Sequence, residues 1–184
     1  MPTSSTGRIV RETVKWLRHT APIRLVDNLS PFIPISRLCE RFSNDLDDIL
    51  NELFDDSERP PNKAILNGGT CFIGIFAILL LIEQPKLILE FLTTRNLSDR
   101  QCPFEGGRPA NFPPDVIWEE FEKQQWQFFP HTFDGHRDDV EIGDDVALPF
   151  TQKEKIASGG SANIYKIIVH KDYDSIVSYW AILD

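Results

Sequence analysis

The chain has 184 residues, which is enough for one or two domains with a buried core. Hydrophobic residues make up 41% and charged residues 26%, a balance that excludes wholesale disorder. The net charge of −9 argues against general nucleic-acid binding, because phosphate recognition draws its affinity from lysine and arginine. We therefore expect no nucleic acid among the partners.

The N-terminal segment carries no sign of secretion. Residues Met1–Thr6 are polar and precede basic residues without a long apolar run, which is not how a secretory signal is built. We therefore expect an intracellular protein, cytoplasmic or nuclear. The widely spaced Cys39, Cys71 and Cys102 form no C-x-x-C pair and predict reduced structural thiols rather than a disulfide framework or a zinc site.

Two amphipathic helices are predicted in the first third of the chain. Residues 8–19 place apolar side chains at helical spacing and predict a helix, ended near Pro22, that packs on the next helix or on a partner. Residues 35–54 give the clearest helical pattern, with Ser36 as its N-terminal cap. The acidic residues of this pattern lack the glycine and closing glutamate of an EF-hand and predict a solvated face: Asp45, Asp47, Asp48 and Glu52.

The most apolar stretch, Cys71–Ile82, is shorter than the about 20 residues that a membrane-spanning helix needs. It predicts a buried core helix capped by Thr70, and we expect no stable membrane insertion. The preceding Gly68 and Gly69 lack the lysine of a phosphate-binding P-loop. A further helix is predicted to start at Pro85, because proline is tolerated in a first turn.

The next part of the chain alternates between loop and helix signals. Residues 98–114 are rich in proline and glycine and predict a surface loop, and residues 115–125 predict another amphipathic helix. The aromatic run that follows predicts an extended segment docked on the core: Trp126, Phe128, Phe129 and Phe133. Residues 131–147 predict an acidic linker, in which His131 and His136 are interpreted as solvated rather than as metal ligands.

Short β-prone runs from Leu148 onward frame a turn of small residues. Such a turn lets backbone N–H groups approach phosphate oxygens, while flanking apolar side chains hold a purine ring. Against the pattern G-x-G-x-x-G-x-V, Ala157, Gly159 and Ala162 take the glycine positions and Ile164 takes the valine position. A plain hairpin with a small-residue turn is the alternative. The candidate nucleotide-binding residues are Ile156, Ala157, Ser158, Gly159, Gly160, Ser161, Ala162 and Ile164.

The segment IASGGSANIYKIIVH resembles the first hairpin of eukaryotic-type protein kinases. The preceding QWQFFPHTF and LPFTQKEKI are similar to the lead-in of a group of fungal protein kinases that carry a helical N-terminal region. The resemblance covers residues 126–174, and a weaker similarity reaches back to EQPKLILEFL. It implies binding of ATP with Mg²⁺ and phosphorylation of protein serine or threonine by full-length relatives.

The groups that complete a kinase site do not follow the hairpin. A kinase needs a lysine on the third strand, a glutamate that pairs with it, a catalytic-loop aspartate with its asparagine, and a metal-binding D-F-G. If Ala181 and Ile182 begin the third strand, Leu183 occupies the lysine position; alternatively, the chain departs from the family before that strand. We interpret the chain as a truncated kinase-like protein and expect weak nucleotide affinity and no phosphotransfer.

The sequence thus predicts a mainly α protein with a small antiparallel β unit at its C-terminus, an α+β fold. Residues 1–130 form a helical module, 131–147 the linker, and 148–184 an incomplete kinase N-lobe. The β unit must dock on the helical module or remain marginal, because a lone hairpin exposes its faces and edges. The alternative function is a helical protein–protein interaction module that uses residues 8–19 and 126–133 as contact surfaces.

Overall fold

The computed structural model describes residues 7–26, 29–66, 71–94, 97–133, 146–158 and 163–175. These residues form a mainly helical fold followed by a two-stranded antiparallel sheet, as predicted. The elements are α1 (Arg8–His19), α2 (Ile35–Leu53), α3 (Asn62–Leu66), α4 (Ile73–Leu81), the 3₁₀ helix η1 (Pro85–Leu87), α5 (Ile88–Thr93), the 3₁₀ helix η2 (Asp99–Gln101), α6 (Trp118–Phe128), β1 (Phe150–Ser158) and β2 (Asn163–Val169).

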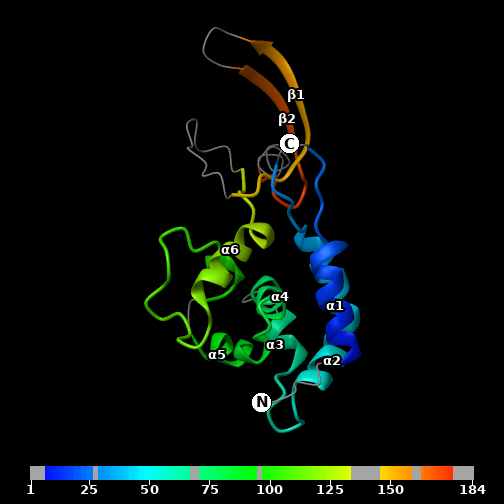
Figure 1. The fold of residues 1–184 in the computed structure, drawn as a ribbon, viewed down its shortest axis with the longest axis vertical. Helices are drawn as coiled ribbons and strands as arrows, with labels where there is room; N and C mark the ends of the chain where they lie inside the picture. Colours follow the sequence, from blue (N-terminus) through cyan, green and yellow to red (C-terminus); the bar gives the residue numbers. More distant parts are fainter. Residues whose placement is uncertain are drawn as a thin grey trace, which may run out of the picture.

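Helix α4 lies at the centre of the helical part, with α1 and α2 on one side and α6 on another (Figure 1). Every residue of α4 is buried, so the prediction of a core helix is confirmed. An apolar sequence all round a helix requires neighbours on all sides, and the surrounding helices provide them. Among the described residues, no helix is both long enough and apolar enough to cross a membrane.

Helices α1 and α2 form where the apolar periodicity predicts them. Helix α1 buries Val10, Thr13 and Leu17, which lie three and four residues apart and therefore share one face. Helix α2 buries five apolar residues at the same kind of spacing: Leu38, Phe42, Leu46, Ile49 and Leu50. The two helices pack side by side and both contact α4.

Helix α6 differs from the prediction at both ends. It begins only at Trp118, since the Ile117 N–H donates to the Gln84 side chain (3.1 Å) in a turn ahead of the helix. It continues through Trp126 to Phe128, so the predicted extended segment is wrong in its first part. The Phe128 ring is 1% exposed, and its burial in the core extends the helix beyond the polar residues that precede it.

Three helix N-termini receive carboxylates from remote parts of the chain. Glu52 accepts two first-turn amides of α1 (3.0 and 2.9 Å), and Asp99 accepts two of α4 (2.9 and 3.0 Å). Asp172 accepts the Ser36 N–H of α2 (2.9 Å). Ser36 therefore does not cap α2, contrary to prediction, and Glu52 belongs to a cap rather than to a solvated face. The predicted cap Thr70 lies outside the described residues.

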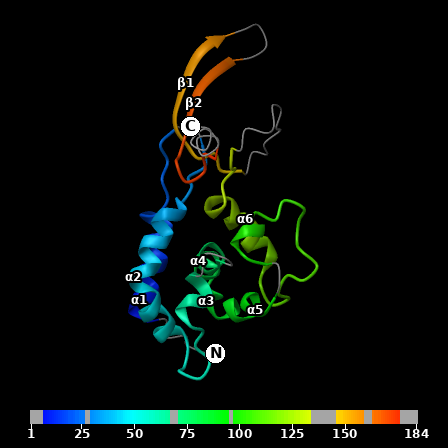
Figure 2. The same ribbon diagram turned by 180° about the vertical axis from the view of Figure 1, so that it is seen from behind.

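The β1–β2 hairpin projects away from the helices, as the views from the front and from behind both show (Figures 1 and 2). Residues 152–158 and 163–168 are exposed on both faces. Only the root of the hairpin docks, where Phe150 and Tyr173 are buried. The sequence left two alternatives for this unit, docking on the helical part or marginal stability; its root docks, and its far end stands free of the helices.

Candidate functional site

The hairpin brings the two apolar candidate residues together across its strands. Opposite residues pair regularly from Lys153–Ile167 to Lys155–Tyr165, and then the register shifts by one residue. At this bulge, Ile156 and Ala157 of β1 together oppose Ile164 of β2. Ile156 and Ile164 therefore lie beside each other at the end of the hairpin next to the small-residue turn.

Both isoleucines face solvent. Ile156 is 60% exposed and Ile164 57%, although side chains of this size are mostly buried in folded proteins. The strands are closed beside the turn by a hydrogen bond between Ser158 and Asn163 (2.9 Å). The remaining candidates, Gly159, Gly160, Ser161 and Ala162, lie outside the described residues.

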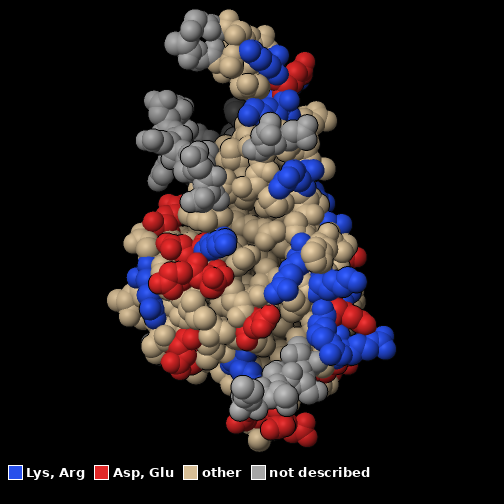
Figure 3. All heavy atoms as spheres, in the orientation of Figure 1, with Lys and Arg blue, Asp and Glu red and all other residues tan. Residues whose placement is uncertain are grey.

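The other face of the hairpin has a different character. Successive residues of a strand point to opposite faces, so Tyr165 and Ile167 lie on the face opposite Ile164. The ammonium of Lys153 lies 4.5 Å from the centre of the Tyr165 ring, a cation–π contact. Figure 3 shows basic side chains on the projecting hairpin and along the edge where α1 lies.

The root of the hairpin is tied to the segment that precedes α2. The rings of Phe32 and Tyr173 pack edge to face, with centroids 5.8 Å apart, and Ala147 is buried with them. The Tyr173 hydroxyl donates to the Ile33 carbonyl (2.8 Å). Burial raises the pKa of this phenol, so it stays a neutral donor at physiological pH. The hairpin is therefore held by residues that are far away in the sequence.

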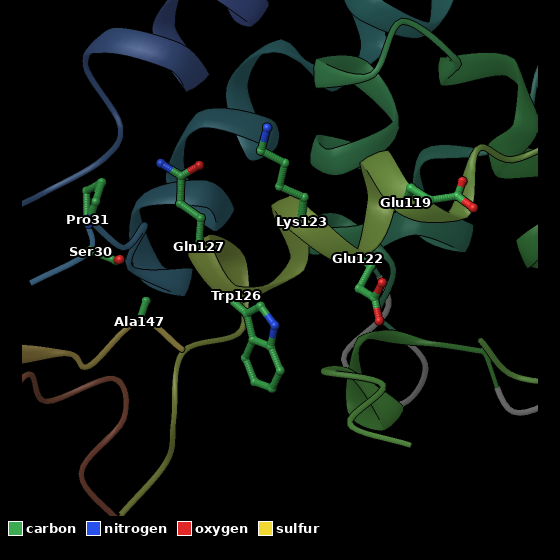
Figure 4. A pocket seen from close by; sticks show the side chains of 8 residues that line it. All are labelled: Ser30, Pro31, Glu119, Glu122, Lys123, Trp126, Gln127 and Ala147. Carbon is green, nitrogen blue, oxygen red and sulfur yellow. The ribbon is translucent and has the colours of Figure 1, made fainter. Parts of the chain in front are cut away.

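A second candidate site is an open groove of about 750 Å³ along α6 (Figure 4). Its lining comes from α6, from the segment before α2 and from the root of the hairpin: Ser30, Pro31, Glu119, Glu122, Lys123, Trp126, Gln127 and Ala147. Glu122 and Trp126 are four residues apart and lie on one face of the helix. Figure 4 shows the indole of Trp126 and the carboxylate of Glu122 on the same side of α6.

The groove partly supports the predicted contact surface of residues 126–133. Trp126 is half-buried and lines the groove, whereas Phe128 points into the core. Among the described residues, Glu119 and Glu122 form no ion pair or hydrogen bond. Unpaired carboxylates beside an indole suit a cationic group, because the indole face attracts cations and the carboxylates pair with them.

The surroundings of the three cysteines disfavour their thiolate forms. Burial raises the pKa of Cys39, and it raises that of Cys71 to about 12 and that of Cys102 well above its usual range. The thiolate is the nucleophilic form, so these thiols stay inert at neutral pH. Cys39, Cys71 and Cys102 form no disulfide in this structure.

The described part of the chain contains no group of three or more histidine, cysteine or acidic side chains that could hold a metal ion. Of the two linker histidines, His131 packs its ring against Phe133, with centroids 4.8 Å apart. His136 lies outside the described residues.

Comparison of the chain with protein-family models, with curated proteins and with solved structures gave no match.

Proposed function

We propose that the β1–β2 hairpin is the glycine-rich first hairpin of a protein-kinase-like nucleotide-binding lobe and that it contacts the adenine ring of ATP bound with Mg²⁺. The observation that carries this proposal is the bulge, which sets Ile156 and Ile164 side by side next to the small-residue turn. These are the positions at which the kinase pattern holds a purine. Their exposed side chains leave room for a planar ligand.

The hairpin supplies one wall of such a site. A purine that contacts the protein through one face buries only part of its surface. Tight binding requires most of the ligand surface to be buried. We therefore expect a dissociation constant in the millimolar range for this chain, no tighter than about 1 mM.

The test is a titration of the ¹⁵N-labelled chain with ATP and Mg²⁺, followed by amide chemical shifts. Saturable shifts are expected at Ile156 and Ile164, and Ile164→Glu is expected to abolish them. Ile167→Glu is the matched control, because Ile167 is also exposed but lies on the opposite face of β2. The absence of saturable shifts in the parent chain, or equal loss in both variants, would contradict the proposal.

The groove along α6 favours a second function, the binding of a basic protein segment. The carboxylates of Glu119 and Glu122 and the indole of Trp126 offer a cation both charge pairing and a π face. This function is independent of the hairpin residues that bind a nucleotide in the first proposal, although Ala147 at the hairpin root also lines the groove.

A short lysine-rich peptide serves as the probe for this second function. Glu122→Gln is expected to weaken its binding about twofold to fivefold, and Trp126→Ala by up to about tenfold. Added salt should weaken binding by the parent chain, because exposed charge pairs are screened. Glu120→Gln, an exposed residue of α6 outside the groove, is the control and should have no effect. Equal losses for Glu120→Gln and Glu122→Gln would exclude the groove as the binding site.

A further inference from the structure

Asp172, in the turn after β2, joins the hairpin root to the first turn of α2. Its side chain is 8% exposed, and one carboxylate oxygen, Oδ2, accepts two hydrogen bonds from a single residue. The Ser36 N–H donates at 2.9 Å and the Ser36 hydroxyl at 2.7 Å. A buried carboxylate needs such donors, because an unpaired buried charge is strongly destabilising.

The other polar groups around Asp172 do not replace Ser36. His170 accepts the Asp172 N–H at Nδ1 (3.2 Å), and the same nitrogen lies 3.9 Å from the other carboxylate oxygen. Because this nitrogen accepts the Asp172 N–H, it donates no hydrogen bond to the carboxylate in this arrangement. Ser36 therefore holds the Asp172 carboxylate, and with Tyr173 it fixes the root of the hairpin on the segment before α2.

Ser36 itself is exposed, so an enzyme can reach its hydroxyl from solvent. We propose that Ser36 is a phosphorylation site and that its modification releases the hairpin root from α2. A protein kinase acting in trans transfers the γ-phosphoryl group of ATP. A bond forms between Ser36 Oγ and the γ-phosphorus, the bond from that phosphorus to the β,γ-bridging oxygen breaks, ADP leaves, and the hydroxyl proton passes to the base of that enzyme.

Phosphorylation changes both partners of this contact. The Ser36 hydroxyl ceases to be a donor, and a group of nearly two negative charges stands beside the buried Asp172 carboxylate. The phosphate is itself well placed at the N-terminus of α2, where the helix dipole favours an anion and where the Ser36 N–H loses its acceptor when Asp172 leaves. Helix α2 thus remains capped by the phosphate while Asp172 is expelled. The outcome is selective release of the hairpin root.

This inference deepens the proposed function, since it regulates the orientation of the hairpin that carries the nucleotide site. Its evidence is independent of nucleotide binding, and its test contains no nucleotide. A failed ATP titration would remove the first proposed function and leave the release of the root intact. Unchanged amide exchange at the hairpin root on phosphorylation would contradict this inference, but it would not bear on nucleotide binding.

The test compares the chain bearing phosphoserine at position 36 with the unmodified chain by amide hydrogen–deuterium exchange. The reporters are the amides of Phe133 and Ser175, which are hydrogen-bonded at the root. Their exchange is expected to accelerate about tenfold or more, while the amides of α2 keep their rates. Phosphoserine at Ser43, an exposed position of the same helix, is the control and should change neither region.

A second variant shows whether charge is the cause. In the phosphorylated chain, Asp172→Asn is expected to restore much of the protection at the root, because it removes the repelling carboxylate.

Phosphopeptide mapping of the chain recovered from its own cells is expected to place phosphate on Ser36. Unaltered exchange at the root, loss of protection throughout α2, or no phosphate on Ser36 in any growth condition would each overturn the proposal.

Discussion

Replacing Phe121 by alanine is expected to lower the free energy of unfolding by about 3–5 kcal/mol, among the largest losses for one substitution in this chain. The Phe121 ring is fully buried and is the centre of an aromatic cluster. Its ring centroid lies 5.1–6.2 Å from those of four other aromatic side chains: Phe91, Phe104, Phe112 and Trp118. Alanine would remove these contacts and leave a cavity that four rigid rings cannot easily fill.

Urea unfolding followed by circular dichroism measures this loss. Phe121→Leu retains most of the volume and is expected to cost less than half as much as Phe121→Ala. Phe133→Ala, at a half-buried ring beside the hairpin root, is the control and should also cost less. A loss below about 1 kcal/mol for Phe121→Ala would show that the cluster does not stabilise the fold as described.

Replacement of Asp99 is expected to give the second large change in the free energy of unfolding, and this change depends on pH. Its two carboxylate oxygens accept the amides of Gly74 and Ile75 at the start of α4. Burial raises the pKa of Asp99 from 3.8 to about 6, although the hydrogen bonds from these amides and from Cys71 oppose that rise. The folded state therefore holds the Asp99 proton more tightly than the unfolded state.

The sign of the pH dependence follows from this order of pKa values. The contribution of Asp99 to stability is fully present below pH 4 and is lost as the pH rises through about 6. The difference between the two pKa values corresponds to roughly 3 kcal/mol. In Asp99→Asn this term is absent, so the stability of the parent chain relative to this variant should fall between pH 4 and pH 7.

Chemical denaturation of both proteins across this pH range measures the effect. Asp99→Ala is expected to cost about 2–4 kcal/mol at pH 5, because two amides at the start of the core helix lose their acceptor. Asp48→Asn, at an exposed acidic residue of α2, is the control and should leave the pH profile unchanged. A parallel pH profile for Asp99→Asn and the parent chain would refute the raised pKa.

Apolar periodicity was sufficient to predict the helices that form the core. Helices α1 and α2 fall within the predicted ranges because spacing along the chain reports which residues share a face, and α4 does so because its continuous apolar run is too short to span a membrane. The hairpin was likewise predicted from a local pattern, a small-residue turn between β-prone runs. Its bulge at Ile156 was not predicted, because register depends on which residues pair across the strands.

The remote caps could not be predicted from the sequence. Ser36 stands where a local cap is common, yet the carboxylate at that helix end comes from Asp172, 136 residues away. The same holds for the aromatic cluster, since Phe104 and Phe112 belong to a segment whose prolines and glycines indicate only a surface loop. In both cases the decisive contact is made in three dimensions between segments with no shared sequence signal.

The remote caps also bear on how the chain folds as it is synthesised. Translation proceeds from the N-terminus, so α1 lacks its capping carboxylate until Glu52 has been made, and α4 lacks its own until Asp99 follows. Of these three helices, α2 is the last to receive its capping carboxylate, because Asp172 is among the last described residues to leave the ribosome. A nascent chain that ends before residue 172 therefore has a second helix without its capping carboxylate and leaves Phe32 uncovered by Tyr173.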